Sequence, residues 1–328
     1  MHTFRVRNLY TSASIGIVIL ERSYNEAESV LRDADISMYQ AKRGGRARYA
    51  VFDRSTRERM SAQLHMEADL RGAVERGEIV AYYQPIVRVH DRRVSGFEAL
   101  ARWNRPGAGL VAAGEFIAVA EQTGLLRSID AALFEHVCAA THVFVREHPD
   151  ITISVNVSAA DLTRPSLIDD MEAAMELHDV RPSSPRLEIT ETAVMEDAAR
   201  SLAVLHRLRD RGFEIVVDDF GVGQSSLSYL QRLPIGGVKI DASFIAPLGT
   251  NAQAIEIVRA IVALTKPLGL SVVAEGVETA EQLRLLQTVG AEYAQGFFFS
   301  PAVETPDARS IVAMPEGAVP DKRHAALP

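Results

Sequence analysis

The sequence predicts an α/β protein whose main part is a closed (β/α)8, TIM-like barrel. From Glu78 onward, short apolar segments alternate with longer segments of helical periodicity. Eight such apolar segments fall within about 240 residues, which is the usual size of one barrel domain. No Gly-x-Gly-x-x-Gly motif follows a predicted strand, and this argues against an open dinucleotide-binding sheet.

The predicted strands and helices follow directly from these two periodicities. The strands are short and rich in aliphatic residues, and we place them at 79–87, 94–100, 151–157, 186–190, 213–218, 237–240, 271–274 and 292–298. The helices show apolar residues three or four positions apart, and we place them at 114–122, 128–147, 166–178, 197–211, 251–268 and 279–289. The barrel domain is therefore predicted to span residues 78–314.

The segments on either side of the barrel are too small to form a second complete domain. Residues 1–54 contain a predicted strand at 11–20, a helix at 26–42 and a short strand at 48–52, which makes a small α+β fragment. Residues 55–77 are strongly charged with helical periodicity, so we expect a connecting helix that ends at Gly77. Residues 315–328 are expected to form a loose tail.

Composition limits the classes of partner. The net charge of −8 makes broad binding to a nucleic-acid backbone a poor fit, although one small phosphorylated ligand held by metal ions remains compatible. Cys138 is the only cysteine, which excludes an intramolecular disulfide and a cysteine-based zinc site, and its apolar surroundings predict a core residue. No apolar run reaches the ~18 residues of a membrane span. We therefore expect a cytoplasmic chain, which leaves open a longer, membrane-linked protein of which it is part.

Polar residues recur at the carboxyl ends of the predicted strands. In a barrel these ends converge on one face, where catalytic groups lie. An ionisable group in an apolar strand is costly to bury without a partner, and here the pattern repeats in strand after strand. The residues concerned are Glu98, Asn156, Glu188, Glu191, Asp218, Asp219, Lys239, Glu275, Glu278 and Gln295.

The chemistry of this set indicates divalent cations. The candidate ligands Glu98, Asn156, Glu188, Asp218 and Asp219 offer hard oxygen atoms and no sulfur or histidine nitrogen, which suits Mg²⁺ or Mn²⁺ rather than zinc. Two adjacent aspartates allow one site to bridge two ions about 3.5–4 Å apart, as in phosphoester cleavage. Lys239 is a candidate for holding the attacking water or the developing negative charge.

Each of these residues also has a structural explanation when it is taken alone. Glu98 could pair with Arg102, Asn156 could cap the helix after the strand, and Lys239 could be an exposed charge at a strand end. Asp218 and Asp219 could belong to a turn. These explanations would have to hold independently at every strand, so the joint pattern favours a site.

Residues 60–310 resemble an EAL domain, the family of cyclic-di-GMP phosphodiesterases. The motifs that carry the resemblance occur in the family's order along the whole domain. They are Tyr83-Gln-Pro-Ile86, Glu98-Ala-Leu100 with Arg102-Trp103, Asn156-Val-Ser158, Glu188-Ile-Thr-Glu191, Asp218-Asp-Phe-Gly221, Lys239-Ile-Asp241, Ala274-Glu-Gly-Val-Glu278 and Gln295-Gly-Phe297.

The resemblance implies a role for each matched residue. Glu98, Asn156, Glu188 and Asp218 would bind a first metal ion, and Asp219 would contribute to a second. Lys239 and Glu275 would organise the attacking water, with Glu275 as the candidate general base. Gln84, Arg102 and Gln295 would lie on the ligand side, and Glu191 would support the loop after Asp219. A homodimer through the EAL domain is left open.

Two departures from the family pattern leave the metal ligands intact. Gln224 stands where the family more often has Tyr, and the segment from Phe297 to Pro301 lacks the basic residue often found after the serine. We expect these changes to affect rate and affinity rather than the reaction itself.

Residues 12–53 resemble the C-terminal end of a GGDEF domain, the diguanylate cyclase family. The matching segments are Ser14-Ile-Gly-Ile17, Ala34-Asp-Ile-Ser-Met-Tyr-Gln-Ala-Lys42, Gly45-Arg46 and Arg48-Tyr-Ala-Val-Phe52. The Gly-Gly-Asp/Glu-Glu-Phe hairpin is missing, so this remnant is not expected to complete a cyclase site.

The sequence thus favours an enzyme that hydrolyses cyclic-di-GMP to linear pGpG with Mg²⁺ or Mn²⁺, in bacterial signalling. The alternative is a catalytically silent cyclic-di-GMP receptor that acts through a protein partner. A silent receptor would be expected to lack one or more carboxylates, and all of them are present. A third hypothesis is an unrelated metal-dependent barrel enzyme, but the ordered motifs argue against it.

Overall fold

The computed structural model describes residues 12–20, 26–43, 45–53, 63–223 and 227–314. The chain divides into two compact units, residues 1–70 and 71–328, which we describe separately.

The first unit is a small α+β fragment, as the sequence predicts. Strand β1 (Ile15–Ile17) pairs in parallel with β2 (Tyr49–Val51), and helix α1 (Ala27–Arg43) packs on them. A Cβ atom at Gly16 would lie 2.0 Å from the backbone oxygen of Ala34, so glycine is what allows this close packing of helix on strand. Residues 63–70 form a helix, followed by turns to Gly77, so the helix ends earlier than predicted; residues 54–62 of the predicted connecting helix lie outside the described residues.

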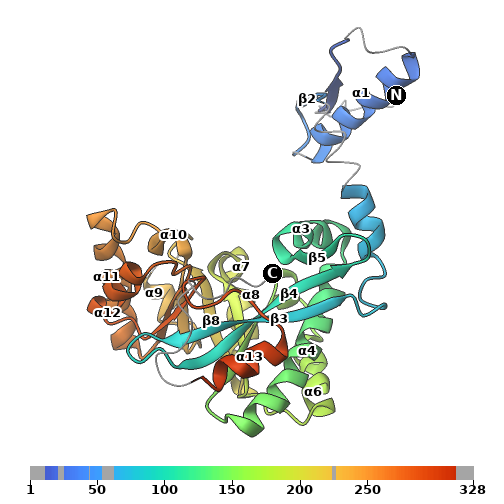
Figure 1. Ribbon diagram of the computed structural model, residues 1–328. Coiled ribbons are helices and arrows are strands. Elements are labelled where there is room, and N and C mark those ends of the chain that lie inside the picture. The colour runs from blue at the N-terminus through green and yellow to red at the C-terminus, as the bar shows by residue number, and fades with distance from the viewer. Residues whose placement is uncertain (1–11, 21–25, 44, 54–62, 224–226, 315–328) are drawn as a thin grey trace, which may run out of the picture. The chain divides into compact units, whose positions relative to one another are not determined.

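The second unit is built around a closed eight-stranded barrel, which confirms the predicted TIM-like fold (Figure 1). The strands are β3 (Ile79–Arg88), β4 (Val94–Arg105), β6 (Thr152–Asn156), β7 (Pro185–Thr190), β8 (Glu214–Phe220), β9 (Gly237–Ile240), β10 (Ser271–Ala274) and β11 (Tyr293–Gln295). They follow the order β3-β11-β10-β9-β8-β7-β6-β4, and pairing between β3 and β4 closes the ring. Strand β5 (Gly109–Ala112) extends β4 as an antiparallel partner.

Six of the longer helices lie around the barrel at the predicted places, and a seventh, at Thr305–Val312, was not predicted. The longer ones are α3 (Ala113–Thr123), α4 (Leu126–Glu147), α6 (Leu167–Leu177), α8 (Ala198–Asp210), α11 (Ala252–Thr265), α12 (Ala280–Val289) and α13 (Thr305–Val312). Short helical turns follow the strands at α5 (Ala159–Leu162), α7 (Glu191–Glu196), α9 (Leu227–Leu230) and α10 (Ala242–Ile245), and the turn η1 (Lys266–Leu268) directly follows α11. None of the described helices is long and apolar enough to cross a membrane.

One strand departs from the uniform β/α repeat. Strand β3 runs antiparallel to both of its neighbours, β4 and β11, whereas the other neighbouring barrel strands are parallel. Only residues 89–93 connect β3 to β4, and a connection this short cannot make the crossover that parallel strands need. The barrel therefore begins with a hairpin.

The last strand is shorter than predicted. The sequence suggested a strand over 292–298, but β11 ends at Gln295. Gly296 has φ of +154°, and a Cβ atom there would lie 2.2 Å from the backbone oxygen of Val277. The chain turns at this glycine, and the Phe298 N–H then donates to the Val277 oxygen at 2.8 Å.

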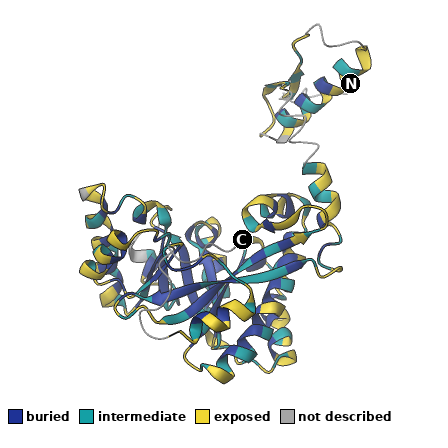
Figure 2. Cartoon of the chain, viewed as in Figure 1, coloured by how far each residue is buried: buried dark blue, intermediate teal, exposed yellow. Residues whose placement is uncertain are grey.

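The interior of the barrel is the core of this unit (Figure 2). Strand β9 is buried at all four positions, as are most residues of β8. Cys138 is buried on α4, which confirms the expectation of a core residue. Such strands are hydrophobic on both faces because helices cover the barrel outside, and the charged residues within them are the exceptions that form the site.

Candidate active site

Lys239 lies at the centre of a ring of carboxylates. It comes from β9 and is only 1% exposed, so its charge has almost no access to solvent. Its Nζ atom lies 3.0 Å from Glu98 Oε2, 2.8 Å from Glu188 Oε2, 3.5 Å from Asp218 Oδ2 and 2.6 Å from Glu275 Oε1. The interpretation of Lys239 as an exposed charge at a strand end is therefore wrong. A buried ammonium group needs such partners, because burying an unpaired charge is very costly.

Glu98 joins the two sides of the barrel opening. Its Oε1 atom accepts a hydrogen bond from Asn156 Nδ2 at 2.9 Å, and its Oε2 atom accepts from Gln295 Nε2 at 2.7 Å. The same Gln295 amide donates to Gln84 Oε1 at 3.1 Å. Side chains from β6 and β11 thus meet at the Glu98 carboxylate on β4, and Gln84 of β3 is joined to it through Gln295. The buried partner of Glu98 is Lys239 rather than Arg102.

Asp218 and Asp219 reach the site together because β8 is irregular at this point. Val217 pairs with Val238 and Phe220 with Ile240, so β8 contains one residue more than β9 over this interval. Consecutive residues of a regular strand point to opposite faces, but Asp219 adopts a left-handed conformation with φ of +52°. A bulge of this kind redirects a side chain, and carboxylate oxygens of Asp218, Asp219 and Glu275 lie within 4.8 Å of one another.

The carboxylates form two groups that share Asp218. Glu98, Glu188 and Asp218 each place one oxygen within 4.8 Å of the others, and Asp218, Asp219 and Glu275 do the same. All donors in these groups are hard oxygens, which are the ligands that Mg²⁺ and Mn²⁺ prefer. Two adjacent groups with one shared carboxylate fit a pair of divalent cations.

The electrostatics of the site also favour cations. Burial raises the pKa of Glu188 and of Asp218, and the neighbouring Glu98 adds to both effects, while Lys239 opposes them. Burial likewise raises the pKa of Glu275 to about 7, again against Lys239. One ammonium group is too little positive charge for this many buried carboxylates, so a divalent cation would be strongly attracted here.

Glu98 and Lys239 are the strongly ionised members of the cluster. Although burial opposes its ionisation, Lys239 and the hydrogen bond from Gln295 hold the pKa of Glu98 below its ordinary value. Burial also disfavours the charged form of Lys239, but Glu188 and Glu98 outweigh it and raise the pKa of the ammonium group well above its ordinary value. The pair is therefore charged across the physiological pH range.

Glu191 contacts the loop that follows Asp219. It is 3% exposed at the start of α7, and its Oε2 atom accepts hydrogen bonds from the backbone N–H groups of Gly221 at 2.9 Å and Gly223 at 3.3 Å. A Cβ atom at residue 223 would lie 2.4 Å from Glu191 Oε1, so only glycine fits against this carboxylate. Gln224 and the two serines of the loop lie outside the described residues.

A pocket of about 350 Å³ opens beside the cluster. It is lined by Gln84, Glu98, Leu100, Ala242, Glu275, Gly276, Glu278, Gln295, Gly296 and Phe297. Gln84 also donates from Nε2 to the Ser300 backbone oxygen at 3.3 Å, which fixes it at the rim. Oε1 of Gln295 is buried and has no hydrogen-bond partner among the described residues. The pocket thus presents polar groups next to the carboxylates.

Arg102 lies further along β4, beyond Leu100. Its guanidinium carbon is 5.9 Å from the centre of the Tyr82 ring, and Nη1 donates to the Ala101 backbone oxygen at 2.9 Å. Burial lowers the pKa of Arg102, partly offset by Tyr82 and Glu98. Arg102, predicted to lie on the ligand side, is therefore not among the described residues that line this pocket.

Two residues at the site had no role in the sequence analysis. Asp241 lies against Asp219 and contributes, after burial and Asp218, to raising the pKa of that carboxylate. It also accepts a hydrogen bond from the Ser243 N–H at the start of α10. Phe297 lines the pocket and is 48% exposed. Asp241 directly follows the strand that carries Lys239, so the search for polar residues at the carboxyl ends of the predicted strands could have found it.

Comparisons with known proteins bear directly on this arrangement. The model of the EAL domain family matches residues 67–302, which is most of the chain. The chain belongs to the EAL family. The model of the diguanylate cyclase GGDEF domain matches residues 1–48, which confirms the resemblance of the N-terminal fragment.

The most similar relatives include EAL proteins of Pseudomonas aeruginosa. The chain is 40% identical over 287 residues to the bifunctional diguanylate cyclase/cyclic di-GMP phosphodiesterase MucR, covering 87% of this chain and 42% of MucR. It is 36% identical over 295 residues to the cyclic di-GMP phosphodiesterase NbdA, covering 90% of this chain and 38% of NbdA. The chain thus spans about two fifths of the length of these curated relatives.

Solved structures show the same EAL fold. The PaMucR phosphodiesterase in complex with c-di-GMP is similar with a TM-score of 0.72 and 39% identity, covering 74% of this chain and 99% of that chain. The EAL domain protein of Listeria monocytogenes is similar with a TM-score of 0.65 and 30% identity, covering 74% of this chain and 96% of that chain.

The site geometry predicts the stability of a Lys239→Met variant. Methionine keeps most of the volume but leaves three buried carboxylates and the partly buried Glu275 without their ammonium partner, so we expect a loss of about 3–5 kcal/mol in chelator-treated protein. The loss should be smaller at pH 5 than at pH 8, because the unpaired carboxylates can take up protons. Mn²⁺ should restore part of it. Urea unfolding measures each of these effects.

The matched control is Lys266→Met, at an exposed lysine, which should change the unfolding free energy by no more than about 0.5 kcal/mol. Equal stability of Lys239→Met and the wild type at pH 8 would contradict the ion-pair cluster.

Proposed function

We propose that this chain hydrolyses cyclic-di-GMP to linear pGpG with the help of Mg²⁺ or Mn²⁺. The observation that carries the proposal is the complete carboxylate cluster around buried Lys239, next to an open pocket. The names of MucR and NbdA support the substrate, since both relatives are cyclic-di-GMP phosphodiesterases. The c-di-GMP complex of PaMucR supports it as well.

The residues divide into metal ligands and groups that handle water. Glu98, Asn156, Glu188 and Asp218 would hold one cation, and Asp219 would contribute to a second with Asp218 shared between them. When bound, the cations lower the pKa of a coordinated water and neutralise phosphate charge. Asp241, which lies against Asp219, is placed to support the second cation.

Glu275 is the proposed general base. Its carboxylate contacts Lys239 at 2.6 Å, and burial raises its pKa to about 7, a value suited to accepting a proton near neutral pH. Lys239 would orient the water and stabilise the charge that develops on the phosphate. In the proposed step the water oxygen would form a new P–O bond as its proton passes to Glu275. The bond from phosphorus to the ribose 3′-oxygen would break, and that oxygen would take up a proton from solvent, which opens the ring.

The remaining predicted residues would act on the substrate and on the loop. Gln84 and Gln295 line the pocket and present amide groups to a ligand. Arg102, two residues beyond Leu100 on β4, would supply a cation for phosphate or base. Glu191 would hold the loop after Asp219 in the productive form through its two backbone hydrogen bonds. A silent receptor is not favoured, because each of the predicted carboxylates is present in the cluster or against its loop.

The direct test incubates the purified chain with cyclic-di-GMP and Mg²⁺ or Mn²⁺ and separates the products by chromatography. We expect pGpG, and we expect Glu98→Ala or Asp218→Asn to lower turnover at least ~10³-fold because a metal ligand is lost. The control Glu256→Gln removes an exposed carboxylate and should turn over normally. Tight binding of cyclic-di-GMP without any pGpG would favour the receptor instead.

Glu191→Ala separates loop support from metal binding. We expect the variant to fold and bind ligand but to lose at least ~10-fold in turnover, with a higher Mn²⁺ concentration needed for half-maximal rate. Glu191→Gln keeps an oxygen that can accept the two N–H groups and should retain more activity. Wild-type rate and wild-type metal dependence in Glu191→Ala would mean that other contacts hold the loop.

A further inference from the structure

A second cavity lies between α4, α6 and the end of β6. Its volume is about 570 Å³, within the range of pockets that bind small organic molecules. Most of its wall is apolar, with Ala131 and Phe134 from α4, Val157 after β6, and Met171, Ala174 and Leu177 from α6. An apolar body of modest size fits such a wall.

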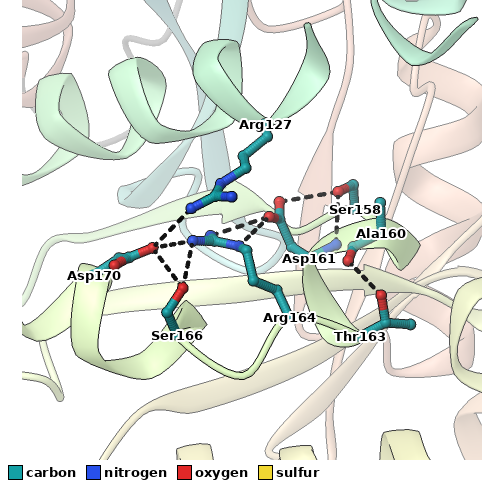
Figure 3. A network of polar contacts seen from close by, with 8 residues as sticks. All are labelled: Arg127, Ser158, Ala160, Asp161, Thr163, Arg164, Ser166 and Asp170. Carbon is teal, nitrogen blue, oxygen red and sulfur yellow. Dashed lines mark hydrogen bonds and ion pairs between the residues drawn. The ribbon is translucent and has the colours of Figure 1, made fainter. Parts of the chain in front are cut away.

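The polar side of this cavity is acidic. Asp130, Glu135, Asp161 and Asp170 line it together with a single cation, Arg164. The positive charge of Arg164 is already used: Nη2 lies 3.1 Å from Asp161 Oδ1, and Nη1 contacts Asp170 (Figure 3). A phosphorylated or carboxylated molecule would therefore meet net negative charge.

The other side chains of the network have partners as well. Figure 3 shows Arg127 and Arg164 converging on Asp170, with Arg127 Nη2 at 3.8 Å from Asp170 Oδ2. The Ser158 hydroxyl donates to Asp161 Oδ2 at 2.9 Å. Asp161 and Asp170 are thus held by residues of the protein.

Asp130 is less completely satisfied than these two carboxylates. Its Oδ2 atom is buried and has no hydrogen-bond partner among the described residues. Burial, and then a hydrogen bond with Asp161 and the charge of that residue, raise the pKa of Asp130 to about 8, while a hydrogen bond with Ser158 and the charge of Arg164 act in the opposite direction. At neutral pH this carboxyl group therefore carries a proton for most of the time, and a cation would replace that proton.

We propose that this cavity binds a small amphipathic cation, with an ammonium or amidinium group at Asp130 and an apolar body against Phe134 and Met171. The cavity wall includes residues 155–157, the end of the strand that carries Asn156. An occupant would thus contact a strand of the proposed metal site, although its binding does not depend on the proposed function.

The test uses three probes with a similar apolar body and different charge: 2-phenylethylamine, 2-phenylethanol and 3-phenylpropanoate. Titration of the full chain, labelled with ¹³C in its methionine methyl groups, reports binding and its location. We expect the amine to shift the Met171 signal, assigned with Met171→Leu, and to bind at least ~10-fold more tightly than the alcohol. The carboxylate should not bind.

Asp130→Asn removes the proposed counter-ion without changing the size of the side chain. The variant should bind the amine no better than the alcohol. In the wild type at pH 7, calorimetry in two buffers should detect proton release when the amine binds, and the variant should show no such release. The control Asp150→Asn, at an exposed position, should behave like the wild type. Equal affinity of the wild type for amine and alcohol, an unshifted Met171 signal, or unchanged amine affinity in Asp130→Asn would overturn the proposal.

Discussion

The buried ammonium group of Lys239 is the constraint on which the site depends. Four carboxylates from β4, β7, β8 and the end of β10 surround it within 3.5 Å. Neither the ammonium group nor the carboxylates could be buried here without the other, because burial of one unpaired charge costs more free energy than the surrounding apolar core can offset. The cluster therefore ties the strands that carry it into one arrangement, while its excess of negative charge attracts cations.

Much of the barrel could be predicted because its strands are continuous apolar segments. Strands β9 and β10 match the predicted bounds, and α4 lies within two residues of its prediction at each end. The antiparallel direction of β3 was missed because periodicity carries no information about direction. The five residues that connect β3 to β4 did contain that information, since parallel strands need a longer crossover.

The sequence predicted which polar residues lie together for a related reason, and it missed features that depend on local backbone geometry. An ionisable residue near the end of an apolar strand, as at Glu98, Glu188 or Lys239, has few explanations other than a shared site. The left-handed conformation of Asp219 could not be predicted, because it arises from the irregular pairing of β8 with β9. The cavity at Asp130 likewise could not be predicted from the sequence pattern, since it depends on how α4 and α6 pack.

We propose that the carboxylates around Lys239 form a divalent metal site. Anomalous diffraction at the manganese edge, from crystals grown with Mn²⁺, tests it most directly. We expect one peak among the oxygens of Glu98, Asn156, Glu188 and Asp218, and a second beside Asp219. Crystals with full Mn²⁺ access but no anomalous peak within coordination distance of these oxygens would contradict it.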